Sequence, residues 1–344
     1  EIQVFGLGEK KALHFYERDC SIQRRFQKII EESPAPQIEK SIIDEMAESA
    51  VNFVTNQKYE GAGTIEYIYD IDNKKFYFLE MNTRIQVEHP VTETITNFDL
   101  VAMQIKFALN LDNNSIEQNK INKSGHAIEC RLYAEDPAKN FLPSPGKITK
   151  LKIPNTGLTN IRLDIGVDEG DEISFYYDPM IAKIISKGVN RIESINNMIQ
   201  YLNELEIEGI NTNKSFLISV LQNKSFENAM YNTKFIENNL SLFIEKTETA
   251  KKIKKDITLQ EKVVQKYTDK DVEAFKKIAA ESPKDKSSKL YTEKDFKAFE
   301  NILNKNNAID KKLPVKNITG KVYEDPIFKP GGDKYMFIEF GNLM

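Results

Sequence analysis

Cysteine and histidine are scarce in this chain of 344 residues, and their scarcity excludes several kinds of site. The two cysteines, Cys20 and Cys130, are far apart and form no CxxC pair, so they predict neither a disulfide framework nor a zinc site. The three histidines, His14, His89 and His126, are too widely spaced to form a local metal cluster. We interpret Cys20, Cys130, His89 and His126 as structural, since neither cysteine stands beside a histidine that would mark a nucleophile.

Long hydrophobic runs and a large excess of one charge are also absent. The sequence has no stretch of about 18 apolar residues, and its first residues lack the charged and then apolar pattern of a signal peptide. A net charge of −4 and a pI near 5.7 leave no basic footprint for nucleic acid. We therefore expect a soluble, cytoplasmic protein with neither a membrane nor a nucleic-acid partner.

The length and the two ends of the sequence suggest how much of a protein is present. A chain of 344 residues exceeds one average domain, so two or three units are expected. It begins Glu-Ile-Gln-Val-Phe-Gly without a methionine, and it stops at Gly-Asn-Leu-Met within an apolar, strand-like run. We expect it to be a piece of a longer polypeptide that lacks an N-terminal half.

The most informative stretch has polar side chains at every second position, namely Glu80, Asn82, Arg84, Gln86 and Glu88. Carboxylate and amide oxygens suit a hard cation such as Mg²⁺, and an arginine fork suits an oxyanion. A fully extended strand would separate the two ends by roughly 26 Å, too far for one small site. We therefore predict a strand through Asn82 and then a tight loop over residues 83–90 that folds back toward the metal ligands.

A hairpin is predicted just before this loop. Residues 64–69 and 76–81 both alternate with period two and flank the turn Asp-Ile-Asp-Asn-Lys-Lys. Pleating places Glu66 and Ile68 on one strand face, and Phe78, Glu80 and Asn82 on one face of the other. If these faces coincide, two carboxylates become neighbours, which favours a cation between them. An isolated acidic pair would more often be a solvated surface feature, but the residues after Asn82 favour the metal site.

The remaining patterns divide the chain into further elements. Residues 1–7 and 12–17 are predicted strands, and Ser41-Ile-Ile-Asp resembles a capping box that opens a helix. From residue 125 onward, strands are predicted at 126–134, 148–153, 161–164, 173–174 and 177–186, with helices at 191–205 and 213–221. This mixture predicts an α+β fold.

The last hundred residues differ in composition. Residues 245–312 are rich in lysine, contain no glycine, and repeat Tyr-Thr-Asp-Lys-Asp-Val-Glu-Ala-Phe at residue 267 as Tyr-Thr-Glu-Lys-Asp-Phe-Lys-Ala-Phe at residue 291. Each copy has a threonine cap before an amphipathic helix, so we predict a helical linker with a solvated lysine face. We predict that residues 316–344 are the start of a further domain.

Three motifs together carry a family resemblance: Arg18-Asp-Cys-Ser-Ile-Gln-Arg-Arg-Phe-Gln-Lys28, residues 76–93, and Gly125-His-Ala-Ile-Glu-Cys-Arg-Leu-Tyr-Ala-Glu-Asp-Pro137. In this order and approximate spacing they closely resemble the biotin carboxylase family of ATP-grasp enzymes. Similar strings follow at Phe141-Leu-Pro-Ser-Pro-Gly146, Tyr177-Asp-Pro-Met-Ile-Ala-Lys183 and Glu208-Gly-Ile-Asn-Thr-Asn213. The resemblance covers residues 1 to about 240. It implies the C-terminal half of an ATP-grasp domain over residues 1–120 and a biotin carboxylase C-terminal domain over residues 121–240.

The resemblance implies a two-step carboxylation of biotin, which is tethered to a carrier domain. ATP phosphorylates bicarbonate to carboxyphosphate, which yields CO₂ for attack by the biotin ureido nitrogen. The residues implied to hold Mg²⁺ or Mn²⁺ on the ATP phosphates are Glu66, Glu80 and Asn82. The residues implied to contact ATP are Gln23, Lys28, Glu66, Ile68, Leu79 and Glu80.

The acceptor half of the site is implied in the same way. The residues implied to bind bicarbonate are Lys28, Arg84, Gln86, Val87 through its backbone, and Glu88. Glu88 would be the general base, with Arg84 and Lys28 as further catalytic residues. Arg131 would bind biotin and stabilise its enolate-like oxygen by a charge-assisted hydrogen bond.

Two departures from the family qualify this resemblance. Phe26 stands where many members have histidine or asparagine, and a phenyl ring cannot donate to a ribose hydroxyl. The family also has an N-terminal domain and a glycine-rich lid, whereas the 15 glycines here are scattered. We predict that this chain alone binds ATP weakly and does not turn over.

The resemblance also implies partners and leaves alternatives. It implies a homodimer through residues 120–240, a biotin carrier domain and a carboxyltransferase domain. Residues 323–341 weakly resemble the opening of the allophanate-hydrolase-subunit-1-like domain of urea carboxylases, so urea is one candidate acceptor, beside acyl-CoA and pyruvate. The alternative functions are another ATP-grasp carbon–nitrogen ligase and a non-catalytic interaction module of a carboxylase.

Overall fold

The computed structural model describes residues 1–9, 11–111, 116–154 and 160–245. These residues belong to one structural unit. The predicted lysine-rich linker and the predicted further domain, from residue 246 onward, lie outside the described residues.

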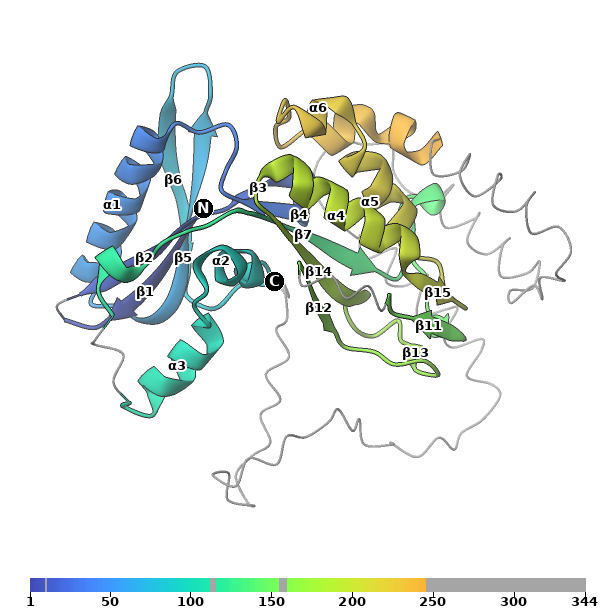
Figure 1. Ribbon diagram of the computed structural model, residues 1–344, viewed down its shortest axis with the longest axis horizontal. Helices are drawn as coiled ribbons and strands as arrows, with labels where there is room; N and C mark the ends of the chain where they lie inside the picture. Colours follow the sequence, from blue (N-terminus) through green and yellow to red (C-terminus); the bar gives the residue numbers. More distant parts are fainter. Residues whose placement is uncertain (10, 112–115, 155–159, 246–344) are drawn as a thin grey trace, which may run out of the picture. The chain divides into compact units, whose positions relative to one another are not determined.

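The first sheet has four antiparallel strands in the order β2-β1-β5-β6. Their bounds are β1 (Ile2–Leu7), β2 (Ala12–Glu17), β5 (Glu60–Asp70) and β6 (Lys75–Asn82). Helix α1 (Lys40–Asn56) lies along one face of this sheet (Figure 1), because its apolar residues recur at helical spacing and are buried there: Ile43, Met46, Ala47, Ala50 and Val54. The predicted strands and helix are confirmed.

The predicted capping box of α1 is wrong. The helix begins at Lys40, and its N-cap residue Glu39 makes no side-chain cap hydrogen bond. Ser41 already lies within the first turn, and an N-cap needs a non-helical backbone. Ser41 therefore cannot be the N-cap residue of α1.

The β5–β6 hairpin confirms the predicted pairing and corrects one of its faces. Glu66 lies opposite Glu80, and Thr64 lies opposite Asn82. A bulge follows Glu66, so that Tyr67 lies opposite Phe78, and Leu79 is the extra residue. Phe78 therefore does not share a face with Glu80: its ring lies 5.4 Å from that of Phe53 on α1 and 6.4 Å from that of Tyr67.

The second sheet has five antiparallel strands in the order β12-β14-β7-β4-β3. Their bounds are β3 (Asp19–Arg24), β4 (Gln27–Ser33), β7 (His126–Tyr133), β12 (Ile161–Ile165) and β14 (Met180–Gly188). The hairpin β3–β4 was not predicted, since the sequence there stands out only as a basic segment. This hairpin, residues 19–33, adds two strands to a sheet whose other strands lie within residues 126–188. The second sheet therefore contains strands from both sides of the domain boundary predicted at residues 120 and 121.

Helices cover both faces of the second sheet. Helices α4 (Arg191–Glu204) and α5 (Lys214–Leu221) pack on one face around a core that includes Ile128, Cys130 and Ile184. Helix α2 (His89–Thr96) packs on the other face, where Val91 and Ile95 meet Ala127 and Ile185. Figure 1 shows α2 beside the second sheet, with α4 and α5 beyond it. The polar loop before α2 is thereby held against both sheets.

The remaining elements are short. They are α3 (Leu100–Ala108), α6 (Lys224–Glu227), the 3₁₀ turns at Gln118–Lys120 and Pro137–Lys139, and the strand pairs β8 (Glu135–Asp136) with β9 (Leu142–Pro143), β10 (Gly146–Lys147) with β13 (Glu172–Ile173), and β11 (Lys150–Lys152) with β15 (Glu206–Glu208). The antiparallel sheets and their helices confirm the α+β class. Among the described helices, none has the length and apolar character that crossing a bilayer requires.

Candidate functional site

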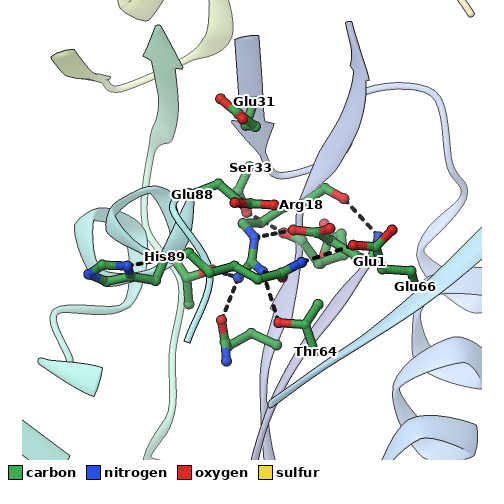
Figure 2. A network of polar contacts seen from close by, with 12 residues as sticks. Glu1, Arg18, Glu31, Ser33, Thr64, Glu66, Glu88 and His89 are labelled. Atoms are coloured by element: carbon green, nitrogen blue, oxygen red, sulfur yellow. Dashed lines mark hydrogen bonds and ion pairs between the residues drawn. The ribbon is translucent and has the colours of Figure 1, made fainter. Parts of the chain in front are cut away.

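Lys28, on β4, lies at the centre of a cluster of carboxylates. Its Nζ lies 2.6 Å from Glu1 Oε2, 2.9 Å from Glu66 Oε1 and 2.6 Å from Glu88 Oε1. Figure 2 shows these acids converging between the two sheets. Burial by itself would lower the pKa of Lys28, but the surrounding anions outweigh burial and raise it. Lys28 is therefore an ammonium ion at neutral pH.

The predicted metal ligands converge on the hairpin. Glu66 and Glu80 occupy opposite register positions, and the Asn82 amide donates to Oε1 of Glu66 at 3.1 Å and to Oε1 of Glu80 at 3.2 Å. A half-turn of this amide would present its oxygen alongside the two carboxylates. Three oxygen ligands of this kind fit Mg²⁺ or Mn²⁺, which also bind substrate phosphates.

Gln86 links the metal ligands to a buried arginine that the sequence analysis did not single out. Its Nε2 donates to Glu66 Oε1 at 2.9 Å, and its Oε1 accepts from Arg18 Nη2 at 2.9 Å. Arg18 also donates to Glu1, Gln3, Thr64 and Thr92. Its guanidinium is fully buried, so its hydrogen bonds fix the position of Gln86. The only sequence signal for Arg18 was its place at the start of the first family-like motif.

Glu88, the predicted general base, lies at the N-terminus of α2 with both oxygens occupied. Oε1 accepts from Lys28 at 2.6 Å, and Oε2 accepts from Arg131 Nη2 at 2.9 Å. Burial and the anion of Glu1 raise the pKa of Glu88, but the cations Lys28, Arg131 and Arg18 outweigh them and lower it. Glu88 is therefore ionised at neutral pH.

Arg131, the predicted biotin ligand, bridges Glu88 and a second buried acid. Its Nη2 meets Glu88, while its Nε donates to Oε1 of Glu31 on β4 at 2.6 Å. The guanidinium can thus turn one edge to a ligand while Glu31 holds the other.

The loop over residues 83–88 presents the other predicted bicarbonate ligands. Arg84 is exposed and donates to the Ile85 carbonyl oxygen at 3.1 Å; among the described residues it has no carboxylate partner. Val87 is buried, and its carbonyl oxygen accepts from Lys183 Nζ at 3.0 Å. Lys183, on β14, also lies 3.6 Å from Asp164. The sequence placed Lys183 in a family-like motif but gave it no role.

The residues predicted to contact the nucleotide base and sugar make no hydrogen bond to the carboxylate cluster around Lys28, among the hydrogen bonds of the described residues. Gln23 donates to the carbonyl oxygen of Cys20 at 2.8 Å. Ile68 and Leu79 are exposed on the hairpin, at 50% and 54% of their surface. Phe26 is 91% exposed at the β3–β4 turn with a φ of 67°. Ile68, Leu79 and Phe26 present exposed side chains that a nucleotide could cover.

Two protein-family models match the chain in succession. Residues 1–115 match the ATP-binding domain of the carbamoyl-phosphate synthase L chain. Residues 129–238 match the biotin carboxylase C-terminal domain. The gap between the matches, residues 116–128, includes the first three residues of β7, and Arg131 on the same strand lies within the second match.

Known proteins resemble the same part of the chain. Biotin carboxylase 1 of Bacillus subtilis is 47% identical over 237 residues, which cover 69% of this chain and 52% of that protein. The biotin carboxylase domain dimer of Hydrogenobacter thermophilus 2-oxoglutarate carboxylase, solved with MgADP and bicarbonate, is 38% identical with a TM-score of 0.67; the match covers 70% of this chain and 52% of that one. Kluyveromyces lactis urea carboxylase is 43% identical with a TM-score of 0.64, over 68% of this chain and 20% of that one. The chain thus spans about half the length of the first relative, or less for a multidomain one.

Proposed function

Residues 1–238 belong to the biotin carboxylase family of ATP-grasp enzymes, and from this premise we propose that the chain contributes to the ATP-dependent carboxylation of carrier-bound biotin by bicarbonate. The observation that carries the proposal is the position of Glu88. This buried carboxylate lies between Lys28 and Arg131, next to the paired acids of the hairpin. A base, an anion-binding cation and metal ligands therefore meet within one network.

In the phosphoryl-transfer half of the site, Glu66, Glu80 and Asn82 would hold Mg²⁺ or Mn²⁺. The metal, when bound, neutralises charge on the ATP phosphates. Gln86 would keep Glu66 in place by the hydrogen bond that it donates to Oε1 of Glu66. Gln23, Ile68 and Leu79 would contact the base and sugar of ATP, where Phe26 contributes no hydrogen-bond donor.

In the acceptor half, Lys28, Arg84, Gln86 and the Val87 backbone would bind bicarbonate. Lys28 already makes short contacts with carboxylates, whose charge and shape bicarbonate shares. Glu88 would take the bicarbonate proton, and Arg131 would turn to the biotin oxygen as negative charge develops there.

We further propose that the activity belongs to a larger assembly in the cytoplasm. Its other parts are a biotin carrier domain, a carboxyltransferase domain and a second copy of this region as a homodimer. The proposed final acceptor is urea, supported by the likeness to Kluyveromyces lactis urea carboxylase and by the motif at residues 323–341. Acyl-CoA and pyruvate are the alternative acceptors. An assay of carboxyl transfer from the purified assembly to urea, acyl-CoA or pyruvate distinguishes the three.

The decisive test of the function joins residues 1–238 to the N-terminal part of Bacillus subtilis biotin carboxylase 1, in place of the matching half of that protein. The chimera should cleave ATP in a reaction that depends on free biotin and bicarbonate. Glu88→Gln should abolish this reaction without loss of folding, since an amide cannot act as a base. A folded chimera with no biotin-dependent cleavage would refute the proposal.

The metal site has a separate test in the 344-residue chain. Glu80→Gln should weaken Mn²⁺ binding, followed by electron paramagnetic resonance, because it removes one charged oxygen ligand. Glu60→Gln, on the same hairpin and exposed, is the matched control. Equal affinity for Mn²⁺ in wild type and Glu80→Gln would contradict the assignment. We also expect ATP cleavage by the isolated chain to stay at background.

A further inference from the structure

Two buried carboxyl groups behind Arg131 take no part in the proposed chemistry. Glu31 on β4 and Glu129 on β7 are both fully buried, and they occupy opposite positions in the antiparallel register. Opposite residues in such a pair have Cβ atoms about 4.5–5.5 Å apart, so their side chains are neighbours on one face of the sheet. Figure 2 shows Glu31 apart from the cluster around Glu88.

The oxygens of these two acids have almost no hydrogen-bond donors. Arg131 Nε donates to Oε1 of Glu31, but Oε2 of Glu31 and both oxygens of Glu129 have no hydrogen-bond partner among the described residues. A buried carboxylate without donors is strongly destabilised, and two adjacent ones repel each other. A proton on one of them removes a charge and supplies a donor to the other.

We infer that Glu31 and Glu129 hold a proton between them at neutral pH and act as a positioning pair for Arg131. The inference rests on the proposed function only for the role of Arg131 as a biotin ligand. The pair then carries no more than one negative charge, so Glu31 and Glu129 together neutralise no more than the single positive charge of Arg131. Its other edge keeps a net attraction for Glu88, or for a developing charge on the biotin oxygen.

The electrostatic surroundings support this protonation. Burial is the main reason that the pKa of Glu31 rises to about 7, and burial and then the anion of Glu31 raise the pKa of Glu129. The charged groups that face the pair come from four elements: Arg131 on β7, Lys183 on β14, Lys28 on β4, and Glu88 at the start of α2. Their cations lower the two pKa values, but not enough to offset burial.

The presence of the proton can be tested in the folded 344-residue chain without ATP, biotin or bicarbonate. Infrared spectra at neutral pH should contain a carboxylic-acid carbonyl band that is lost in Glu129→Gln. The exposed Glu60→Gln is the control and should leave the band unchanged, whereas Glu135→Gln should remove only the separate contribution of Glu135, another buried glutamate whose pKa is raised to about 7. Absence of any carboxylic-acid band in the folded wild type overturns the inference, even if none of the variants folds.

The positioning role has its own readout, the NMR signal of the Arg131 Nε–H group, assigned with Arg131→Lys. In wild type this signal should shift with pH as the pair titrates, with a midpoint above the ordinary glutamate pKa. In Glu129→Gln the midpoint should fall, since Glu31 then has an amide donor and no acidic neighbour. In Glu135→Gln the midpoint should stay. An identical midpoint in wild type and Glu129→Gln would overturn the inference and leave the proposed carboxylation untouched.

Discussion

Replacing Lys28 with methionine removes a cation that three carboxylates share. The side chain of Lys28 is only 16% exposed, and Glu1 and Glu88 are almost fully buried beside it. Removing one partner of a buried ion pair costs about 3–5 kcal/mol, because a buried charge loses its partner. For a protein of this size each kcal/mol lowers Tm by about 2–4 °C, so we expect a fall of ~6–20 °C at neutral pH.

The destabilisation should depend on pH in a defined direction. The pKa values of Glu1 and Glu88 are lowered in the folded protein, where burial acts to raise them and Lys28 is among the groups that lower them. A carboxylate with a lowered pKa stabilises the fold above its unfolded pKa, and this stabilisation is lost as pH falls through the folded value. Without Lys28 these acids take up protons at higher pH. The deficit of Lys28→Met should therefore be largest near pH 7 and shrink as pH falls toward about 4.

Thermal and urea unfolding of the 344-residue chain between about pH 7 and pH 4 measures this deficit. Lys40→Met is the matched control, since Lys40 is 86% exposed and pairs with Asp44 on the surface of α1. Exposed pairs of this kind contribute about 0–1 kcal/mol. The reasoning is refuted if Lys28→Met destabilises no more than Lys40→Met, or if its deficit is the same at every pH.

Three further predictions concern residues around the site. Arg18→Met should lower the free energy of unfolding by about 3–5 kcal/mol, measured in urea, because it removes the fully buried cation beside Glu1 and the hydrogen-bond donor of Gln3 and Gln86. Lys183→Met should speed hydrogen exchange of the backbone amides over residues 83–88, since it frees the Val87 carbonyl oxygen, whereas Lys187→Met on the same strand should not. Burial is the main reason that the pKa of His89 falls to about 4. Protonation of His89 should therefore cost the folded chain ~3 kcal/mol of stability as pH falls from about 6.5 to 4, and His89→Gln should lack this contribution.

The local part of the site could be predicted from the sequence because strand pairing fixes it. The alternation of residues 64–69 and 76–81 predicted a hairpin in which Glu66 and Glu80 become neighbours if the two strand faces coincide, and they do lie opposite each other. The span argument predicted the loop after Asn82. The bulge after Glu66 escaped prediction, because alternation gives no sign of one extra residue. The wrong face for Phe78 follows from that single insertion.

The supporting residues could not be predicted, because their partners are distant in sequence. Arg18 reaches Gln86 across 68 positions, and Lys183 reaches the Val87 carbonyl oxygen across 96. Periodicity reports which face a side chain occupies, not which distant strand it meets. Strands β3 and β4 were missed for a related reason, since polar residues such as Gln23, Lys28 and Glu31 interrupt the apolar alternation that marks a strand.

The contacts of Glu88 do not favour the proposed role as a general base, and this constrains how the site can work. A carboxylate is a weak base when nearby cations lower its pKa and when both of its oxygens already accept hydrogen bonds, here from Lys28 and Arg131. Arg131 has a second anchor in Glu31, so it can leave Glu88 without losing its place in the site. Its turn to the biotin oxygen would therefore raise the pKa of Glu88 and bind biotin in one movement.

The same argument predicts the effect of removing Arg131 altogether. In Arg131→Met, the carboxyl carbon of Glu88, followed by ¹³C NMR, should titrate at higher pH than in wild type, because one of the two cations that donate hydrogen bonds to Glu88 is gone. In Arg84→Met, Glu88 should titrate at the same pH as in wild type, since Arg84 is exposed and donates to the Ile85 carbonyl oxygen. If Glu88 titrated at the same pH in all three proteins, Arg131 would not control the base. Base activation and biotin binding would then be separate events.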